Sequence, residues 1–82
     1  MWFVYILKCS DQSFYTGVTN DLEKRLECHN AGKGAKYTRG RGPVKIVYTE
    51  KKKSRSTALK RELEIKSWPR TRKMSLILDN SV

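Results

Sequence analysis

Two short runs of β-branched and aromatic residues, separated by a turn, are the feature that most narrows the fold. The segments Trp2–Leu7 and Phe14–Thr19 have the composition of strands. Between them, Ser10–Ser13 is a polar run that favours a tight turn. When the connection between two strands is this short, the strands form a hairpin. The chain is therefore predicted to begin with two hydrogen-bonded strands.

A helix is predicted directly after this hairpin. Asn20 followed three residues later by Glu23 has the spacing of a capping box, which starts a helix over residues 21–30. Ala31-Gly32 provides its stop, because glycine readily adopts the left-handed conformation that ends helices.

The rest of the chain adds one strand and two helices. In the third strand, Val44, Ile46 and Tyr48 are predicted to share one face. The segments are a glycine-rich basic loop over residues 32–42, a strand over Val44–Thr49, a charged connection over Lys51–Lys53, a helix from Ser54 or Ser56 to Ser67, and a helix over Thr71–Leu78. The order β-β-α-β-α-α predicts an α+β fold, with helices on a small, three-stranded, mainly antiparallel sheet. Without an internal repeat, residues 1–82 are predicted to form one domain.

The charge of the chain is large and unevenly distributed. The formal net charge is +10, which attracts polyanions. No acidic residue lies between Glu27 and Glu50, or between Glu50 and Glu62, although both intervals are rich in lysine and arginine. These two basic tracts predict a phosphate-binding face; the alternative is that the charge only keeps the protein soluble. The side chains expected to bind nucleic acid are Lys33, Lys36, Arg39, Arg41, Lys45, Lys52 and Arg55.

Export and membrane insertion are not indicated. The apolar run Trp2–Leu7 is too short to span a bilayer and has no basic flank before it. We therefore expect a cytoplasmic protein with reduced thiols at Cys9 and Cys28. A zinc site built from these cysteines and His29 is a weak alternative, since no fourth ligand has motif spacing.

Glu62 is the most informative single residue, because it interrupts an apolar helix stripe. It lies four residues after Ala58 and three before Ile65. A charge in such a stripe is costly unless it is paired or holds a metal ion. The alternative is a carboxylate at the edge of the stripe, in an i, i+4 ion pair with Lys66.

Four more polar side chains are candidates for a site. Arg25 and His29 are one turn apart on the first helix, so both can reach one cleft; an arginine neutralises phosphoryl charge and a histidine accepts protons near neutral pH. Tyr5 and Tyr15 lie on the paired strands. A tyrosine base requires a pKa lowered from about 10 by nearby cations. The alternative for Arg25 and His29 is a solvated helix edge. The alternative for Tyr5 and Tyr15 is packing in the core.

In this order and spacing, the sequence resembles the GIY-YIG nuclease superfamily, over nearly the whole chain. The segments that carry the resemblance are Val4-Tyr5-Ile6, Tyr15-Thr16-Gly17, Arg25 and His29, the run from Gly32 to Thr38, the run from Pro43 to Tyr48, and Glu62 within Ala58–Lys66. The runs from Gly32 to Thr38 and from Pro43 to Tyr48 are similar to the small single-domain bacterial branch. That branch is like the nuclease domain of enzymes that cut branched DNA. Phe3-Val4-Tyr5 replaces Gly-Ile-Tyr, and Thr16 replaces the middle residue of the second signature.

The resemblance implies a one-metal phosphodiesterase. Glu62 would hold Mg²⁺ or Mn²⁺ with water as the other ligands, and Arg25 would stabilise charge on the phosphoryl oxygens. Tyr5, helped by Tyr15 or His29, would position or deprotonate the attacking water. Gly17 would keep the floor of the cleft open. The expected substrate is DNA rather than RNA, branched or single-stranded, in a setting such as DNA repair.

Two other functions stay open at this point. One is a catalytically idle module that binds nucleic acid with the same fold. The other is a basic protein–protein adaptor, which is supported only by the charge and the small size of the chain. The presence of all the polar candidates favours the enzyme over the idle module.

Overall fold

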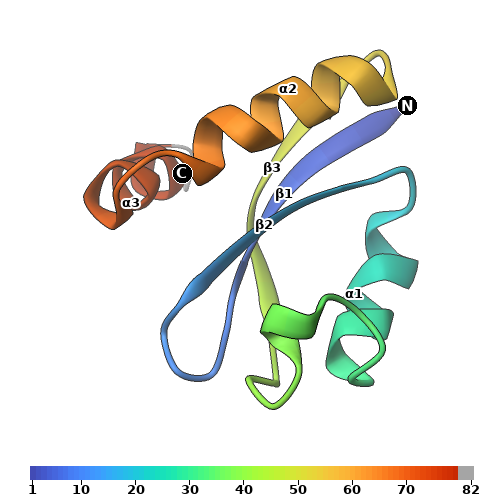
Figure 1. The fold of residues 1–82 in the computed structure, drawn as a ribbon, viewed down its shortest axis with the longest axis vertical. Coiled ribbons are helices and arrows are strands. Elements are labelled where there is room, and N and C mark those ends of the chain that lie inside the picture. The colour runs from blue at the N-terminus through green and yellow to red at the C-terminus, as the bar shows by residue number, and fades with distance from the viewer. Residues whose placement is uncertain (80–82) are drawn as a thin grey trace.

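The sheet has three antiparallel strands with β1 in the middle, in the order β2-β1-β3 (Figure 1). The computed structural model describes residues 1–79; the last three residues of the predicted domain lie outside this part. The elements are β1 (Trp2–Lys8), β2 (Phe14–Thr19), α1 (Leu22–Asn30), a short 3-10 helix η1 (Lys36–Thr38), β3 (Lys45–Lys52), α2 (Arg55–Lys66) and α3 (Arg70–Asp79). The predicted α+β class and the order β-β-α-β-α-α are confirmed.

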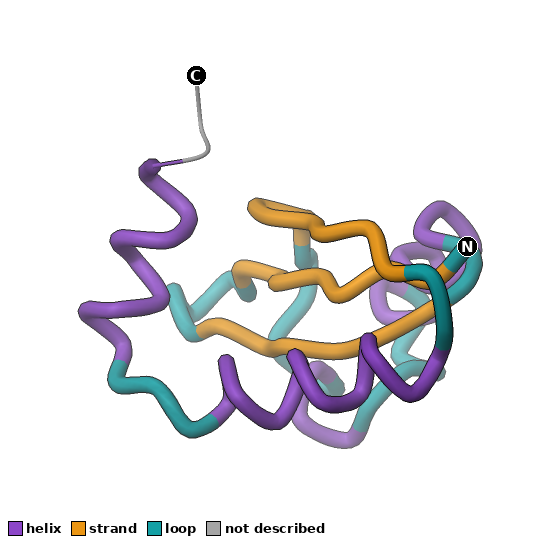
Figure 2. Tube along the Cα trace, turned by 90° about the horizontal axis from the view of Figure 1, so that it is seen from above, coloured by secondary structure: helices purple, strands orange, loops and turns teal. Residues whose placement is uncertain are grey.

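The central strand β1 is buried on both sides, and this divides the core in two. Val4 and Ile6 pack with Ala58 and Ile65 on the face covered by α2. The intervening residues Tyr5 and Leu7 pack on the other face, against α1 and the start of β3. Figure 2 shows α2 running along the sheet while α3 turns away from its end. A strand with two buried faces can present a polar group to either one.

Helix α1 begins one residue later than predicted, because Asp21 caps it. The Asp21 backbone is extended, and its carboxylate accepts a hydrogen bond from the backbone N–H of Lys24 at 3.1 Å. The predicted capping box of Asn20 and Glu23 is therefore wrong. An aspartate at this position satisfies a free N–H and places its charge at the positive end of the helix dipole. The predicted end is confirmed, with Ala31 as the C-cap and Gly32 at φ +75°.

Strand β3 differs from the prediction in length and in the facing of its side chains. It continues to Lys52, through most of the segment predicted as a connection. A bulge opposite Ile6 and Leu7 makes Val47 the extra residue, and an extra residue reverses the side-chain alternation beyond it. Ile46 therefore packs on the α1 face and Tyr48 on the α2 face, so their predicted common face is wrong.

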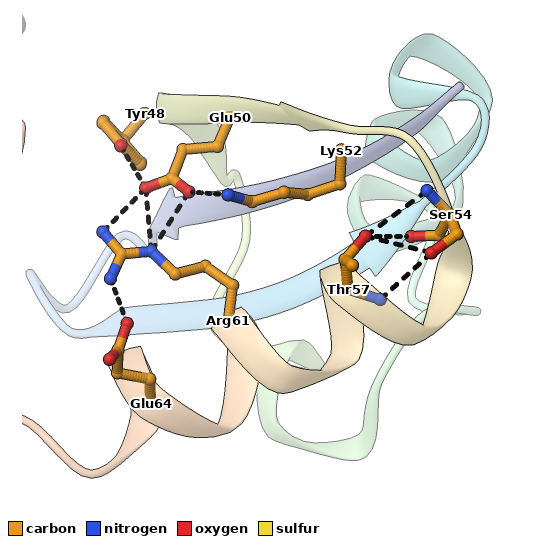
Figure 3. A network of polar contacts seen from close by, with 7 residues as sticks. All are labelled: Tyr48, Glu50, Lys52, Ser54, Thr57, Arg61 and Glu64. Carbon is orange, nitrogen blue, oxygen red and sulfur yellow. Dashed lines mark hydrogen bonds and ion pairs between the residues drawn. The ribbon is translucent and has the colours of Figure 1, made fainter.

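A polar network ties α2 to β3 (Figure 3). The Glu50 carboxylate accepts a hydrogen bond from Arg61 Nη2 at 2.9 Å, an ion pair from Lys52 Nζ at 3.2 Å, and the Tyr48 hydroxyl. Arg61 also pairs with Glu64 one turn along the helix. Every charge in the network thus has an opposite charge beside it.

The start of α2 settles which serine caps it. Ser54 accepts from the backbone N–H of Thr57, and the Thr57 hydroxyl lies within bonding distance of the Ser54 backbone N–H (Figure 3). This reciprocal box satisfies two N–H groups at once. It fixes the helix that carries Glu62 relative to the end of β3.

Candidate active site

A chain of hydrogen bonds through His29 is the centre of the site. His29 Nε2 is 2.9 Å from the Tyr5 hydroxyl, and Nδ1 is 2.8 Å from Thr38 Oγ1. Thr38 donates its only hydroxyl proton to the carbonyl of Ala35 at 2.9 Å, so toward His29 it can only accept. The proton of the neutral ring therefore sits on Nδ1, and Nε2 accepts the proton of the Tyr5 hydroxyl.

Arg25 approaches the same hydroxyl from one turn earlier on α1. Its Nε donates to the Tyr5 oxygen at 3.3 Å. Burial, followed by the positive charge of Arg25, lowers the pKa of His29, so the imidazole is neutral at pH 7. Burial also raises the pKa of Tyr5, against the opposing effect of the Arg25 hydrogen bond. A tyrosine that acts as a base on its own needs a lowered pKa, and Tyr5 does not have one.

Helix α1 can place both groups because Arg25 and His29 lie on the same face as its apolar residues, at i, i+3, i+4, i+7 spacing. Leu22 and Leu26 pack against the cluster that contains Tyr5 and Leu7, and the Asp21 cap starts the helix at a fixed point. Arg25 and His29 then lie one turn apart and point to one hydroxyl. The spacing predicted from the sequence is confirmed here as a shared contact.

Two glycines make room for the rings. Tyr5 pairs with Gly17 across the hairpin, and a Cβ at Gly17 would lie 2.6 Å from the Tyr5 hydroxyl oxygen. A Cβ at Gly34 would collide with the His29 ring. Side chains at either position would displace the bonded groups. Gly17 therefore leaves room for the Tyr5 ring, in addition to its predicted role of keeping the floor of the cleft open.

Tyr15 and Glu62 border this centre from the β2 and α2 side. The Tyr15 ring centroid is 5.3 Å from that of His29 and 6.4 Å from that of Tyr5. Lys66 Nζ lies 5.8 Å from the Tyr15 centroid and 3.7 Å from a Glu62 carboxylate oxygen. The Glu62 charge is close enough to contribute to the raised pKa of Tyr5. All five polar candidates thus lie in one connected region.

The Glu62 carboxylate fits a cation held by one protein ligand. Its side chain is 14% exposed, while the neighbouring Leu63 is 67% exposed, so α2 turns the acid inward and the leucine outward. No hydrogen bond to it is found within residues 1–79, and its ion pair with Lys66 is long. The same residues contain no cluster of three or more histidine, cysteine or acidic groups for a metal. Both His29 ring nitrogens are already bonded, which disfavours the zinc alternative.

The predicted phosphate-binding residues come from two segments that lie far apart along β3. The glycine-rich loop and the turn before α2 lie at opposite ends of β3 (Figure 1), roughly 23 Å apart by strand rise. Arg41 and Lys52 are engaged in ion pairs, with Asp11 and Glu50 respectively, each at 3.2 Å. The exposed members of the set are Lys33, Lys36, Arg39, Lys45 and Arg55. The two tracts therefore flank the Tyr5–His29 centre.

Comparison with known proteins decides the family. The model of the GIY-YIG catalytic domain matches residues 1–75. The chain belongs to the GIY-YIG family. It is 56% identical to the UPF0213 protein CPE1444 of Clostridium perfringens over all of this chain and 88% of that protein, and 58% identical to the UPF0213 protein HQ_3675A of Haloquadratum walsbyi over 90% and 83%.

A solved relative has the same fold. The solution NMR structure of the UPF0213 protein BH0048 from Bacillus halodurans matches with a TM-score of 0.63 at 46% identity, covering 98% of this chain and 86% of that one. GIY-YIG membership implies nuclease-type activity on nucleic acid, and GIY-YIG nucleases generally use a divalent metal ion. No helix within residues 1–79 is long and apolar enough to cross a membrane.

Sequence reasoning missed two members of the site, Thr38 and Gly34. Both lie in the glycine-rich loop, which folds back on the imidazole of His29. No local pattern indicates this contact. It depends on the loop returning from the end of α1 to the sheet.

Proposed function

We propose that this protein is a divalent-metal-dependent endonuclease that hydrolyses phosphodiester bonds in DNA. The observation that carries the proposal is the Tyr5 hydroxyl, which is buried between the acceptor nitrogen of a neutral His29 and the guanidinium of Arg25. A tyrosine in plain core packing has no need of both. The family match supports the reaction class.

The hydrogen-bond directions define a proton path. As the attacking water approaches phosphorus, it transfers a proton to the Tyr5 oxygen, whose own proton passes to His29 Nε2. The water oxygen bonds to phosphorus, and the leaving oxygen departs with its bonding electrons and takes a proton from solvent. Because the two transfers are concerted, Tyr5 carries little negative charge, which reconciles its role with its raised pKa. Thr38 holds the resting proton on Nδ1, so that Nε2 stays free to accept.

The contacts of Arg25 support a role in binding the phosphate. One of its donors is used on Tyr5, and an arginine has five N–H donors in total. Its side chain also lines a surface hollow of about 410 Å³ together with Asn20 and Arg55. Two guanidinium groups beside one hollow favour a phosphodiester there. Arg25 would stabilise the charge that develops on the phosphoryl oxygens.

Glu62 is the residue that would hold the metal ion. A carboxylate is the oxygen donor that Mg²⁺ and Mn²⁺ prefer, with water and phosphate oxygens as further ligands. When bound, the ion would supply Lewis-acid polarisation of the phosphate and stabilise the leaving oxygen. The expectations of DNA over RNA, and of a place in DNA repair and the cytoplasm, stay predictions.

One observation favours the idle binding module instead. The ion pair between Glu62 and Lys66 can be purely structural, as the i, i+4 spacing allows. In that case Glu62 neutralises a lysine and holds no cation. The two functions therefore differ in what Glu62→Gln does.

The test compares Glu62→Gln with Glu64→Gln, a matched change on the same helix whose acid pairs with Arg61. For the enzyme, Mn²⁺-dependent cleavage of single-stranded and branched DNA falls about a thousandfold or more in Glu62→Gln, which corresponds to about 4 kcal/mol. Glu64→Gln retains activity. Melting temperature of Glu62→Gln should hold or rise. Unchanged cleavage with a lower melting temperature would refute the assignment and support the structural ion pair.

A further inference from the structure

An ordered stack of flat groups leads outward from the active site. The His29 ring contacts the Tyr15 ring at 5.3 Å with a tilt of 58°, and the Tyr15 ring stacks on Tyr37 at 6.0 Å with an interplanar angle of 26°. The Arg41 guanidinium carbon then lies 4.5 Å from the Tyr37 centroid. The stack thus runs from a buried ring, 1% exposed, to the protein surface.

The outer end of the stack is exposed and rigidly held. Tyr37 is 42% exposed although its ring packs on Tyr15. The Arg41 guanidinium is fixed by its Nε, which donates to the carbonyl of Tyr37 at 2.8 Å, and by its ion pair with Asp11 at 3.2 Å. These contacts hold a flat cation in place without using up its outer surface, since 40% of the side chain is exposed.

We propose that Tyr37 and Arg41 form a stacking site for one unpaired nucleobase. Aromatic rings and guanidinium planes are the groups on which proteins stack bases splayed out of a helix. The inference rests on the proposed function only for the class of ligand, nucleic acid. It adds that the base next to the cut phosphate is unpaired, because the faces of paired bases inside a duplex are covered by their neighbours.

The surroundings of the stack suit a nucleotide better than an apolar ligand. Lys36 and Arg39, on either side of Tyr37 in the same loop, are exposed cations that can take the flanking phosphates. Thr38, the residue after Tyr37, is bonded to His29. A base stacked on the outer surface of the Arg41 guanidinium, which lies over Tyr37, therefore comes close to the catalytic centre. Arg41, predicted as a phosphate contact, becomes part of the base site.

The test is a binding measurement in EDTA, which needs no cleavage. Probes are a single-stranded oligonucleotide, the same strand in a matched duplex, and a duplex with one unpaired base. Tyr37→Leu removes the ring on which the Arg41 guanidinium lies but keeps an apolar side chain, and Tyr37→Phe keeps the ring. We expect Tyr37→Leu to lose roughly 5- to 100-fold in affinity for the two probes with unpaired bases, with little change for the matched duplex. Tyr37→Phe should bind as the wild type does.

Salt dependence separates stacking from phosphate contacts. A plot of log affinity against log salt should keep its slope in Tyr37→Leu, because no counterion is released or retained by a ring. Lys36→Met is the matched control in the same loop, and it should reduce the slope by about 0.7–0.9. An equal loss for all three probes, or no loss for any, would overturn the stacking site. Failure of the proposed nuclease activity would appear only in cleavage and would leave this measurement unaffected.

Discussion

Two networks in this small protein contain the same kinds of side chain, a tyrosine hydroxyl beside an arginine and an acceptor. On the α1 face, Tyr5 lies between Arg25 and the neutral His29. On the α2 face, Tyr48 donates to Glu50, which is also bound by Arg61. Both tyrosines have a raised pKa, that of Tyr48 reaching about 12, with burial as the first cause in each case.

The difference lies in what the acceptor can still do. The Glu50 carboxylate accepts bonds from Tyr48, Arg61 and Lys52. These bonds stabilise its charged form, which disfavours transfer of the Tyr48 proton to it. The His29 imidazole can take the tyrosine proton and remain bonded through Thr38. Residue types alone would not distinguish these networks. The protonation state of the acceptor does. A neutral imidazole can bind one more proton, which supports the proposed proton transfer in the first network, whereas the ion-paired carboxylate of the second network anchors α2.

The largest expected effect is on catalysis, from Tyr5→Phe. Removing the hydroxyl deletes the proton path but keeps the ring over Gly17, so cleavage should fall roughly 10²- to 10⁴-fold with a small change in melting temperature. Tyr48→Phe is the matched control and should cleave at the wild-type rate. Single-turnover cleavage of both variants measures this. Equal losses in both would remove the functional distinction between the networks.

Stability should show the reverse pattern. In Glu50→Gln, Arg61 and Lys52 lose their shared partner at a carboxylate that is only 15% exposed. We expect the free energy of unfolding to fall by about 3 kcal/mol, measured by urea denaturation. Cleavage per folded molecule should be unchanged. Glu64→Gln, which loses a more exposed ion pair, should cost about 1 kcal/mol or less; a similar cost in both would mean that Glu50 anchors nothing.

The smallest expected effect is that the two networks lose their contributions to stability at different pH values. The pKa of His29 is lowered, so below about pH 6.5 the unfolded chain takes up a proton that the folded chain resists. This stability contribution is present above pH 6.5 and is lost as the pH falls. Burial favours a higher pKa for Glu50, yet its bonds to Arg61 and Tyr48 outweigh this and lower the pKa. Its contribution is therefore lost only in more acidic solution.

Urea titrations of the wild type and of His29→Gln at stepped pH check this order. The difference between them should appear as the pH falls below about 6.5, and should cease to grow once the folded His29 is protonated. The acidic limb of the cleavage rate should also lie below pH 6.5, since Nε2 must be free to accept. A limb above that value would contradict the proton path.

The fold was predictable because local composition decides most of it. The β-rich runs, the turn and the apolar helix faces specify the elements, and the one-turn spacing of Arg25 and His29 specifies a shared direction. The N-cap was missed because Asn20 and Asp21 are both good caps, and only the backbone path after Thr19 selects the second. The bulge in β3 was missed because the pattern of Val44–Tyr48 reads as regular alternation.

The site was predictable in its titrating groups but not in their bonding. Thr38 contacts His29 through a loop whose return path no residue pattern encodes. The direction of the Tyr5 pKa shift was missed because burial outweighs the neighbouring cation, and burial depends on tertiary packing. Arg41 was predicted as a nucleic-acid contact without its ion pair, because Asp11 lies thirty residues away in the chain and beside it only in the fold.

The glycines beneath Tyr5 and His29 have a consequence for recognising active relatives of this protein. At Gly17 and Gly34 the required feature is an absent methyl group, since a Cβ at either position would occupy the space of a bonded ring. A chain that kept every titrating residue but carried alanine at these two positions would pass any inventory of functional groups. It would still be unable to assemble them. The site therefore depends on unoccupied space at these two positions, and in the sequence the only sign of this requirement is glycine.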